Sequence, residues 1–289
     1  MTQNSYRYLI TDIYMPSGTS NPIKAELPFT DVLFNQTLNG VGSFQGKLLL
    51  SGMPNKDLDT LNQTIPMQKA IFVEHRSDAS PTGAIVWGGV ICTRDYDSEN
   101  QILSITAQEY EYYLQRRRIN SFTNSAYYNN TTQGLVYTSI DAGTILYDLV
   151  TNMQVDNSTT HKTNTNIGLA CDLYSTGSAV SRTYFDFELK SVYQALKDLS
   201  QGSFFDFKVM PQYDAYNNIV LTMKVGSPAH AGSALNKVYN PATPSSATVF
   251  QFPGNLISYK YTEDGTTASN YCWGLGYGKN YNKIYNSSK

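Results

Sequence analysis

Few residues in this sequence have the types and spacing that enzyme chemistry requires. None of the three histidines lies in an HExxH or H-x-E pattern that would hold a zinc ion: His75, His161 and His230. No G-x-S-x-G segment is present to expose a serine nucleophile. A cysteine paired with a histidine stays open as an alternative, because such partners meet only in space. The sequence therefore predicts a protein that is not an enzyme and needs no cofactor.

The three cysteines, Cys92, Cys171 and Cys272, are widely spaced and form no CxxC pair. A disulfide framework or a zinc site would need more cysteines at closer spacing. We interpret all three as small buried hydrophobic residues, and no metal site is expected.

Two short segments look like ligand-binding loops but lack the required context. The glycine-rich run at residues 40–46 is followed by a strand pattern, whereas a phosphate loop needs a helix N-terminus there. Asp95, Asp97 and Glu99 alternate as in a calcium loop, but Asn100 stands where that loop needs a glycine. Both segments are interpreted as turns between strands.

The sharpest charge feature is the run of Arg116, Arg117 and Arg118 in a chain with only 15% charged residues. In a monomer, such a run is a solvated end of a strand or helix. In an assembly, guanidinium groups can pair with a neighbour's carboxylates or line a channel, since arginine forms bidentate pairs well. We predict an assembly-interface or channel role for these residues. Their replacement by alanine should impair assembly and leave the monomer fold intact.

Composition narrows the class of protein further. The shortage of charge in this 289-residue chain is made up by Asn, Ser, Thr and 23 Tyr, which suits both β structure and large protein–protein contacts. A net charge of −2 argues against a nucleic-acid binder that neutralises phosphates. No apolar stretch approaches the length of a membrane span, and the N-terminus has no signal-peptide pattern. The chain is therefore expected to fold in a cytoplasm.

The elements that must position any site are mainly strands. Strand patterns cover residues 6–14, 44–50, 70–74, 84–93 and 102–107, separated by Gly-, Pro- and Asn-rich turns. The run at 84–93 is nearly continuous in apolar residues, which predicts a strand buried on both faces. Strands spaced in this way favour an antiparallel barrel or sandwich.

Two helices interrupt the strands in the middle of the chain. The first is predicted after Asp141 as N-cap, and the second after Ser191, with Gln194 at the capping-box position and Gly202 ending the helix. Strands are predicted again at residues 204–210, 219–225, 249–252, 256–262 and 271–277. We therefore predict a mainly β fold with an α+β insertion. The predicted parts are a tube-like β domain at residues 1–118, a mixed α/β insertion domain at 119–245 and a C-terminal β segment at 246–289.

Several segments, taken in order, resemble the tail-tip hub proteins, or minor tail proteins, of siphophages that infect actinobacteria. In the first half these are YRYL at 6–9, AELPF at 25–29, LNGVGSF at 38–44, LLL at 48–50, WGGVI at 87–91, EY at 109–110, YL at 113–114 and RRRI at 116–119. In the second half they are the helix at 191–202, FFDF at 204–207, FPGNL at 252–256, YTED at 261–264 and WGLG at 273–276. The resemblance rests on the order and spacing of these weak motifs and covers most of the chain.

This resemblance implies a homotrimeric structural protein of the virion, located at the tail tip and folded in the host cytoplasm. Each subunit is expected to supply tube-like β domains, so that three copies match a six-fold tail tube around a DNA channel. Expected partners are the tail tube or distal tail protein, the tape measure and tip or fibre proteins, with no sequence-specific DNA binding. Members of the family usually continue beyond the point where this chain stops, so the second tube-like domain is expected to be partial.

Two other classes of protein compete with this interpretation. A carbohydrate-binding β-sandwich for the host surface would use Tyr and Trp to stack on sugars, but only Trp87 and Trp273 are present, both within strand patterns. A cell-wall hydrolase would need a convergent acid pair or a metal, and the sequence shows neither.

Overall fold

A computed structural model describes the fold of this protein. The described residues are 5–14, 21–50, 57–77, 80–120, 122–155, 166–203, 205–226, 272–275 and 285–288. The predicted strands at 249–252 and 256–262 lie outside them. The chain divides into two compact units, Met1–Ala247 and Thr248–Lys289.

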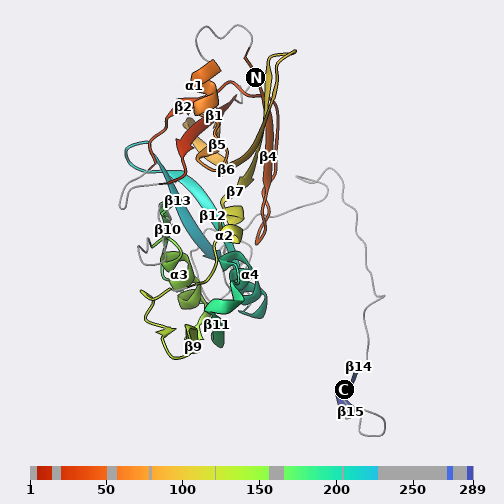
Figure 1. The fold of residues 1–289 in the computed structure, drawn as a ribbon, viewed down its shortest axis with the longest axis vertical. Helices are drawn as coiled ribbons and strands as arrows, with labels where there is room; N and C mark the ends of the chain where they lie inside the picture. Colours follow the sequence, from red (N-terminus) through yellow and green to blue (C-terminus); the bar gives the residue numbers. More distant parts are fainter. Residues whose placement is uncertain are drawn as a thin grey trace. The chain divides into compact units, whose positions relative to one another are not determined.

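The larger unit is built on a curled seven-stranded antiparallel sheet with strand order β2-β1-β5-β6-β7-β4-β3 (Figure 1). Its strands are β1 (Ser5–Asp12), β2 (Ala25–Glu26), β3 (Thr30–Phe34), β4 (Ser43–Leu49), β5 (Lys69–Ser77), β6 (Ser80–Asp97) and β7 (Ile102–Glu109). A short helix, α1 (Asp57–Asn62), stands between β4 and β5. The mainly β fold expected from the sequence is confirmed.

The two faces of this sheet carry different cores. Strand β4 alternates strictly between exposed and buried residues, so only its inner face is covered. Strands β1, β5 and β6 are buried on both faces over part of their length, as neighbouring residues such as Val90 and Ile91 belong to opposite cores. The prediction of a strand buried on both faces is correct for Trp87–Ile91, whereas Ala84–Val86 are at least partly exposed.

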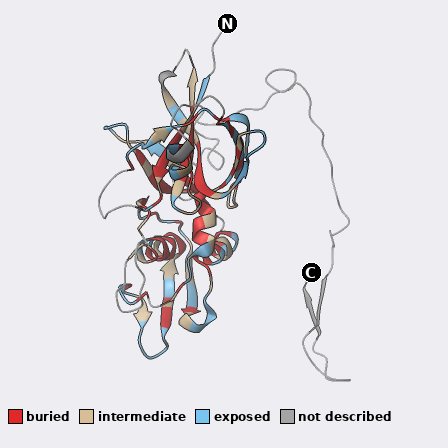
Figure 2. Cartoon of the chain, turned by 45° about the horizontal axis from the view of Figure 1, so that its top comes forward, coloured by how far each residue is buried: buried red, intermediate tan, exposed pale blue. Residues whose placement is uncertain are grey.

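The core on the outer face joins the sheet to a helix-bearing part of the same unit. This part comprises α2 (Tyr110–Arg116), β8 (Tyr128–Asn129), β9 (Gly134–Asp141), α3 (Ala142–Asn152), β10 (Leu169–Cys171), β11 (Ala179–Phe185), the 3₁₀ turn η2 (Asp186–Glu188), α4 (Val192–Ser203), β12 (Asp206–Tyr213) and β13 (Ile219–Gly226). Its strands form two small sheets of order β10-β13-β12 and β11-β9-β8. Figure 1 shows β12 and β13 between the large sheet and helices α3 and α4. Buried residues gather along the strands and on the inner sides of these helices (Figure 2).

Both long helices begin where the sequence predicts. Asp141 accepts a hydrogen bond from Gly143 N–H at 2.8 Å, and Ser191 Oγ accepts one from Gln194 N–H at 3.1 Å. The predicted end of the second helix is wrong, because α4 continues through Gly202 to Ser203. Gly202 is not one of the glycines with a positive φ. It therefore belongs to the last turn of the helix and is not a left-handed cap.

In the smaller unit, the structure describes one antiparallel pair, β14 (Cys272–Leu275) with β15 (Tyr285–Ser288). Strand β14 falls within the predicted strand at 271–277. The domain ranges 1–118, 119–245 and 246–289 stay a prediction.

Candidate functional site

The arginine run lies at the C-terminal end of α2. Arg116 is exposed and its guanidinium donates to the Tyr112 hydroxyl at 3.1 Å. Arg118 is also exposed and its backbone forms an isolated bridge with Ser191. Arg117 is half-buried, with its guanidinium carbon 4.4 Å from the centre of the Tyr113 ring. Arg116 and Arg118 are therefore available to a partner, whereas Arg117 also packs within the subunit.

A second charged group, which the sequence interpretation missed, is buried where β7 meets β12. Glu109 and Lys208 form an ion pair, and the exposed fractions of these residues are only 2% and 7%. The same Glu109 oxygen accepts a hydrogen bond from Gly42 N–H at 2.6 Å, and Lys208 donates to Thr37 O at 3.1 Å. A side chain at position 42 would place its Cβ 2.5 Å from that carboxylate oxygen, so glycine is required there. This pair ties the loop before β4 to two distant strands.

Glu111, in the first turn of α2, completes the buried group. It is fully buried, and its Oε1 lies 3.6 Å from Lys208 Nζ and accepts the Val209 N–H at 2.8 Å. Burial raises the pKa of Glu111 to about 7, against the opposing effects of Lys208 and of the hydrogen bond from Val209. Two carboxylates share one lysine, so the cost of burying charge is only partly offset.

These side chains close the free edge of β12. Strand β12 is an edge of its sheet, pairing only with β13. On its other side, Phe207 N–H donates to Asn39 Oδ1 at 2.7 Å and Val209 N–H donates to Glu111 Oε1 at 2.8 Å. The next residue on that side is Pro211, which has no N–H. No outward N–H in this stretch is left to pair with another strand.

The edge at β3 is different. Asn35 donates its N–H to Ser43 O at 3.0 Å. Because successive backbone N–H groups of a strand point to opposite sides, the N–H of Leu33 also points towards β4 and the N–H of Phe34 points away from it. Within the described residues, no acceptor is paired with that N–H. The first half of β3 is bulged near Asp31, which has a φ of 51° and forms an ion pair with Lys47 at 3.0 Å. The second half, where the Leu33 residue is 67% exposed, presents an open edge.

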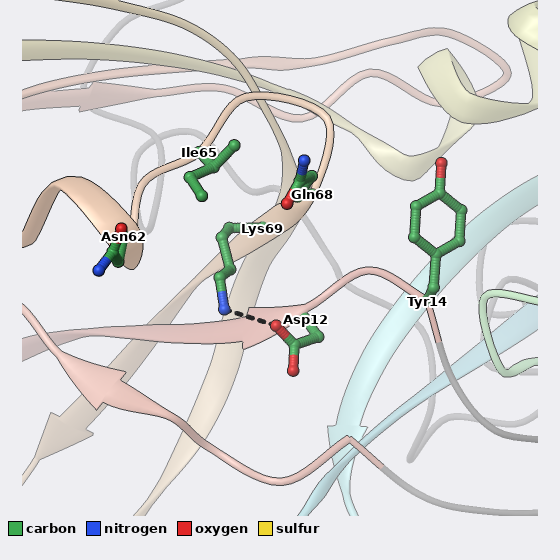
Figure 3. Close-up of a pocket in the computed structure, with 6 residues that line it drawn as sticks. All are labelled: Asp12, Tyr14, Asn62, Ile65, Gln68 and Lys69. Carbon is green, nitrogen blue, oxygen red and sulfur yellow. Dashed lines mark hydrogen bonds and ion pairs between the residues drawn. The ribbon is translucent and has the colours of Figure 1, made fainter. Parts of the chain in front are cut away.

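The described residues of the larger unit line at least two hollows. One, of about 530 Å³, runs beside β12 and is lined mostly by apolar residues, with Lys208 as its one charged group. Another, of about 630 Å³, contains an ion pair between Lys69 and Asp12 at 2.5 Å (Figure 3). In Figure 3 the polar groups of Asn62 and Gln68 do not converge with this pair on one point. Neither hollow brings together a nucleophile, a base and an orienting group.

The described histidine and cysteines are not arranged for chemistry. His75 lies in β5 with its ring centre 5.1 Å from that of Tyr6, whereas His161 and His230 fall outside the described residues. Cys92 and Cys171 are half-buried, so the interpretation of the cysteines as buried residues is wrong for these two. Burial raises the pKa of the Cys171 thiol to about 12, which is opposite to an activated nucleophile. Within the part of the chain that is described, no cluster of three His, Cys, Asp or Glu residues could hold a metal ion. None of the described helices is long and apolar enough to cross a membrane.

Neither a family model nor a curated protein matches this sequence. Solved structures that match include a tail protein from Neisseria meningitidis, at 12% identity and TM-score 0.34, with 74% of this chain and 50% of that one covered. The 43 kDa tail protein of prophage MuSo2 from Shewanella oneidensis matches at 10% identity and TM-score 0.36, covering 75% of this chain and 54% of that one. A type VI secretion component from E. coli, described as similar to T4 phage tail proteins gp27 and gp5, matches at 11% identity and TM-score 0.36, covering 77% and 46%.

These three solved structures are thus two tail proteins, one of them from a prophage, and a component of a type VI secretion system. This chain spans about half the length of each of them. All three TM-scores are below 0.5.

Two features of the sequence could have indicated that Glu109, Glu111 and Lys208 are buried. Glu109 and Glu111 flank Tyr110 at the end of the strand pattern that begins at residue 102, and Lys208 interrupts the strand pattern at 204–210. Charges within apolar runs indicate burial with a partner. Their pairing joins residues 99 positions apart, which periodicity does not show.

Proposed function

We propose that this protein is a structural component of a long-tailed phage tail, forming a homotrimeric hub at the tail tip without catalytic activity. In this role three copies adapt the six-fold tail tube to a three-fold tip and surround the channel through which DNA passes. Its partners are other copies of itself, the tail tube or distal tail protein, the tape measure and tip or fibre proteins. The ordered sequence motifs that resemble siphophage hub proteins support this assignment.

The observation that carries the proposal is the open edge of β3 on a curled, unclosed sheet. Strands at a free edge pair readily with another chain, and soluble proteins usually block such edges. Here the edge of β12 is closed by side chains and a proline, and the second half of β3 is not. A sheet that continues from one subunit to the next uses an open edge of this kind.

The charge of the molecule fits a channel that passes DNA without holding it. A net charge of −2 gives no overall attraction to phosphates, and the exposed Arg116 and Arg118 supply local positive charge only. A sugar-binding role is less favoured, since Trp87 is fully buried and donates its indole N–H to Asn35 O at 2.9 Å. That side chain is not available to stack on a sugar ring.

Purification of the whole chain, followed by light scattering and negative-stain imaging, tests the proposal. A hub predicts three times the 32.2 kDa chain mass and ring-shaped particles with a central opening. A stable monomer that binds cell-surface glycans would overturn the hub and favour the sugar-binding alternative. Hydrolysis of cell-wall fragments by the purified chain would contradict the absence of catalysis.

A further inference from the structure

One lysine serves two buried carboxylates where α2, β7 and β12 meet. Lys208 forms an ion pair with Glu109, and its Nζ lies 3.6 Å from Glu111 Oε1. None of these three residues is more than 7% exposed. A single cation thus stands between a carboxylate that it contacts and a second one that it does not yet contact closely.

The two carboxylates are satisfied unequally. Glu109 Oε2 accepts a hydrogen bond from Gly42 N–H at 2.6 Å in addition to its pair with Lys208. Glu111 Oε1 accepts the Val209 N–H at 2.8 Å, but its Oε2 is buried and has no hydrogen-bond partner within the described residues. A charged Glu111 would therefore be poorly compensated, and burial raises its pKa to about 7.

Other titratable groups also lie around α2, against which β6, β7, β12 and α4 pack. Those near the helix include Glu109 of β7, Lys208 and Asp206 of β12, Tyr193 of α4 and Cys92 of β6. Burial raises the pKa of Tyr193, and Glu111 raises it further. Burial also raises the pKa of the Cys92 thiol, which lies near Arg116 at the other end of α2. Neither Tyr193 nor Cys92 therefore takes up charge near neutral pH in place of Glu111.

Thr37 connects this buried group to the loop between β3 and β4. Its carbonyl oxygen accepts a hydrogen bond from Lys208 Nζ at 3.1 Å, and its N–H donates to Glu109 Oε2 at 3.4 Å. The next residue, Leu38, is 48% exposed and lines the hollow beside β12 together with Thr37 and Lys208. Asn39, further along the loop, is fixed separately by groups of β12 and α4. Thr37 and Leu38 are thus the part of the loop that Lys208 helps to hold.

We propose that Lys208 is a pH-operated latch on the loop between β3 and β4. While Glu111 is neutral, Lys208 holds Glu109 and Thr37 O, as this structure shows. When Glu111 loses its proton, the ammonium group closes the 3.6 Å gap to Glu111 and leaves Thr37 O, because the new charge lacks other donors. Thr37 and Leu38 are then released. The latch lies within one subunit and operates whether or not copies of the chain assemble.

Methyl NMR of the whole chain, labelled at its leucine methyl groups, tests the latch. The Leu38 signals, assigned with Leu38→Ile, should shift as the pH rises, with a midpoint near 7, because their segment is released when Glu111 ionises. Leu49 is the internal control, since it is 50% exposed on β4 and lies outside the latch. Leu38 signals that stay in place through pH 7, or that shift together with those of Leu49, would overturn the proposal.

Two variants should fix the latch in opposite positions. Glu111→Gln removes the ionising group, so the Leu38 signals should keep their low-pH position throughout the titration. Glu109→Gln keeps an oxygen acceptor for Gly42 N–H and leaves Glu111 as the remaining carboxylate beside Lys208. The Leu38 signals of this variant should therefore occupy the high-pH position even on the acidic side of pH 7.

Glu188→Gln, at an exposed position, is the matched control and should titrate as the wild type does. A wild-type titration in Glu111→Gln would mean that another group moves the loop, and this result rejects the latch. A low-pH position retained in Glu109→Gln would mean that Lys208 does not transfer to Glu111, and it rejects the latch equally. Circular dichroism shows whether each variant is folded, and Glu111→Gln decides the question alone if Glu109→Gln does not fold.

Discussion

Two edge strands of this protein, β12 and β3, differ in how their outward backbone groups are satisfied. On β12, Asn39 and Glu111 accept the outward N–H groups of Phe207 and Val209, and Pro211 removes the next one. On β3, the outward N–H of Phe34 has no such acceptor among the described residues. The chain buries charged groups to block one edge and leaves half of another open. This contrast supports the proposal that copies of the chain pair through β3, and the following changes test it.

Loss of Lys208, which pairs with the buried carboxylates beside the closed edge of β12, should lower stability more than any other change. Lys208→Met leaves Glu109 and Glu111 buried without their shared cation, and we expect the free energy of unfolding to fall by about 3–5 kcal/mol. Urea denaturation followed by circular dichroism measures this change. Lys47→Met is the control: its pair with Asp31 is solvent-exposed, and its loss should cost about 0–1 kcal/mol. Equal effects of the two changes would contradict a buried, paired Lys208.

The closed edge should also give the protein a pH-dependent stability. Because the folded-state pKa of Glu111 is raised to about 7, the folded state binds its proton more tightly than the unfolded state does. The resulting stabilisation is fully present below the unfolded pKa of about 4.5 and is lost as the pH rises through about 7. Glu111→Gln keeps an oxygen acceptor for Val209 and removes the charge. Relative to the wild type it should gain on the order of 3 kcal/mol between pH 4.5 and pH 8.

Denaturation of Glu111→Gln and the wild type across that pH range measures the difference directly. Glu188→Gln, at an exposed position, is the control and should leave the pH dependence unchanged. A constant difference between Glu111→Gln and the wild type at every pH would contradict the raised pKa.

Removal of the amide that caps β12 should have an intermediate effect. Asn39 has a φ of 53°, so Asn39→Gly removes the side chain without backbone strain. It leaves the Phe207 N–H without its acceptor, and we expect a loss of about 1–3 kcal/mol in unfolding free energy. Asn217→Gly is matched, with a φ of 60° at an exposed turn, and should change stability by a few tenths of a kcal/mol. Thermal unfolding that ranks the two variants equally would refute the capping role.

A change at the open edge should alter association and not stability. Leu33 is 67% exposed, so Leu33→Lys should change the unfolding free energy by less than about 0.5 kcal/mol. Its charge should nevertheless weaken association of the copies, since lysine on an edge strand opposes pairing. Leu49→Lys is the control, because Leu49 is 50% exposed but lies on β4, which has neighbours on both sides. Association unaffected by Leu33→Lys, measured by light scattering, would count against pairing at β3.

The strands and long helices of this fold could be predicted where one local signal sufficed. The strand pattern after a glycine-rich turn identified β4, and the caps at Asp141 and Ser191 identified α3 and α4. Strand β11 was missed because three consecutive residues at its centre, Ser181, Arg182 and Thr183, are polar and exposed, which removes the apolar alternation. Helix α2 was missed because it begins directly at the end of β7 without a side-chain cap.

The candidate site was less predictable than the fold. The arginine run was visible as charge, but the stacking of Arg117 on Tyr113 depends on the turn at the end of α2. The closed edge of β12 combines Asn39, Glu111 and Pro211, which come from three separate parts of the chain. A single sequence shows the type of each residue and not which distant strand it will meet.

Amide hydrogen exchange tests the contrast between the two edges most directly. The N–H groups of Phe207 and Val209 should exchange slowly at every protein concentration, because their acceptors lie within the subunit. The N–H of Phe34 should exchange fast in dilute solution and become protected as the copies assemble. Fast exchange on β12, or exchange on β3 that does not respond to assembly, would contradict the account.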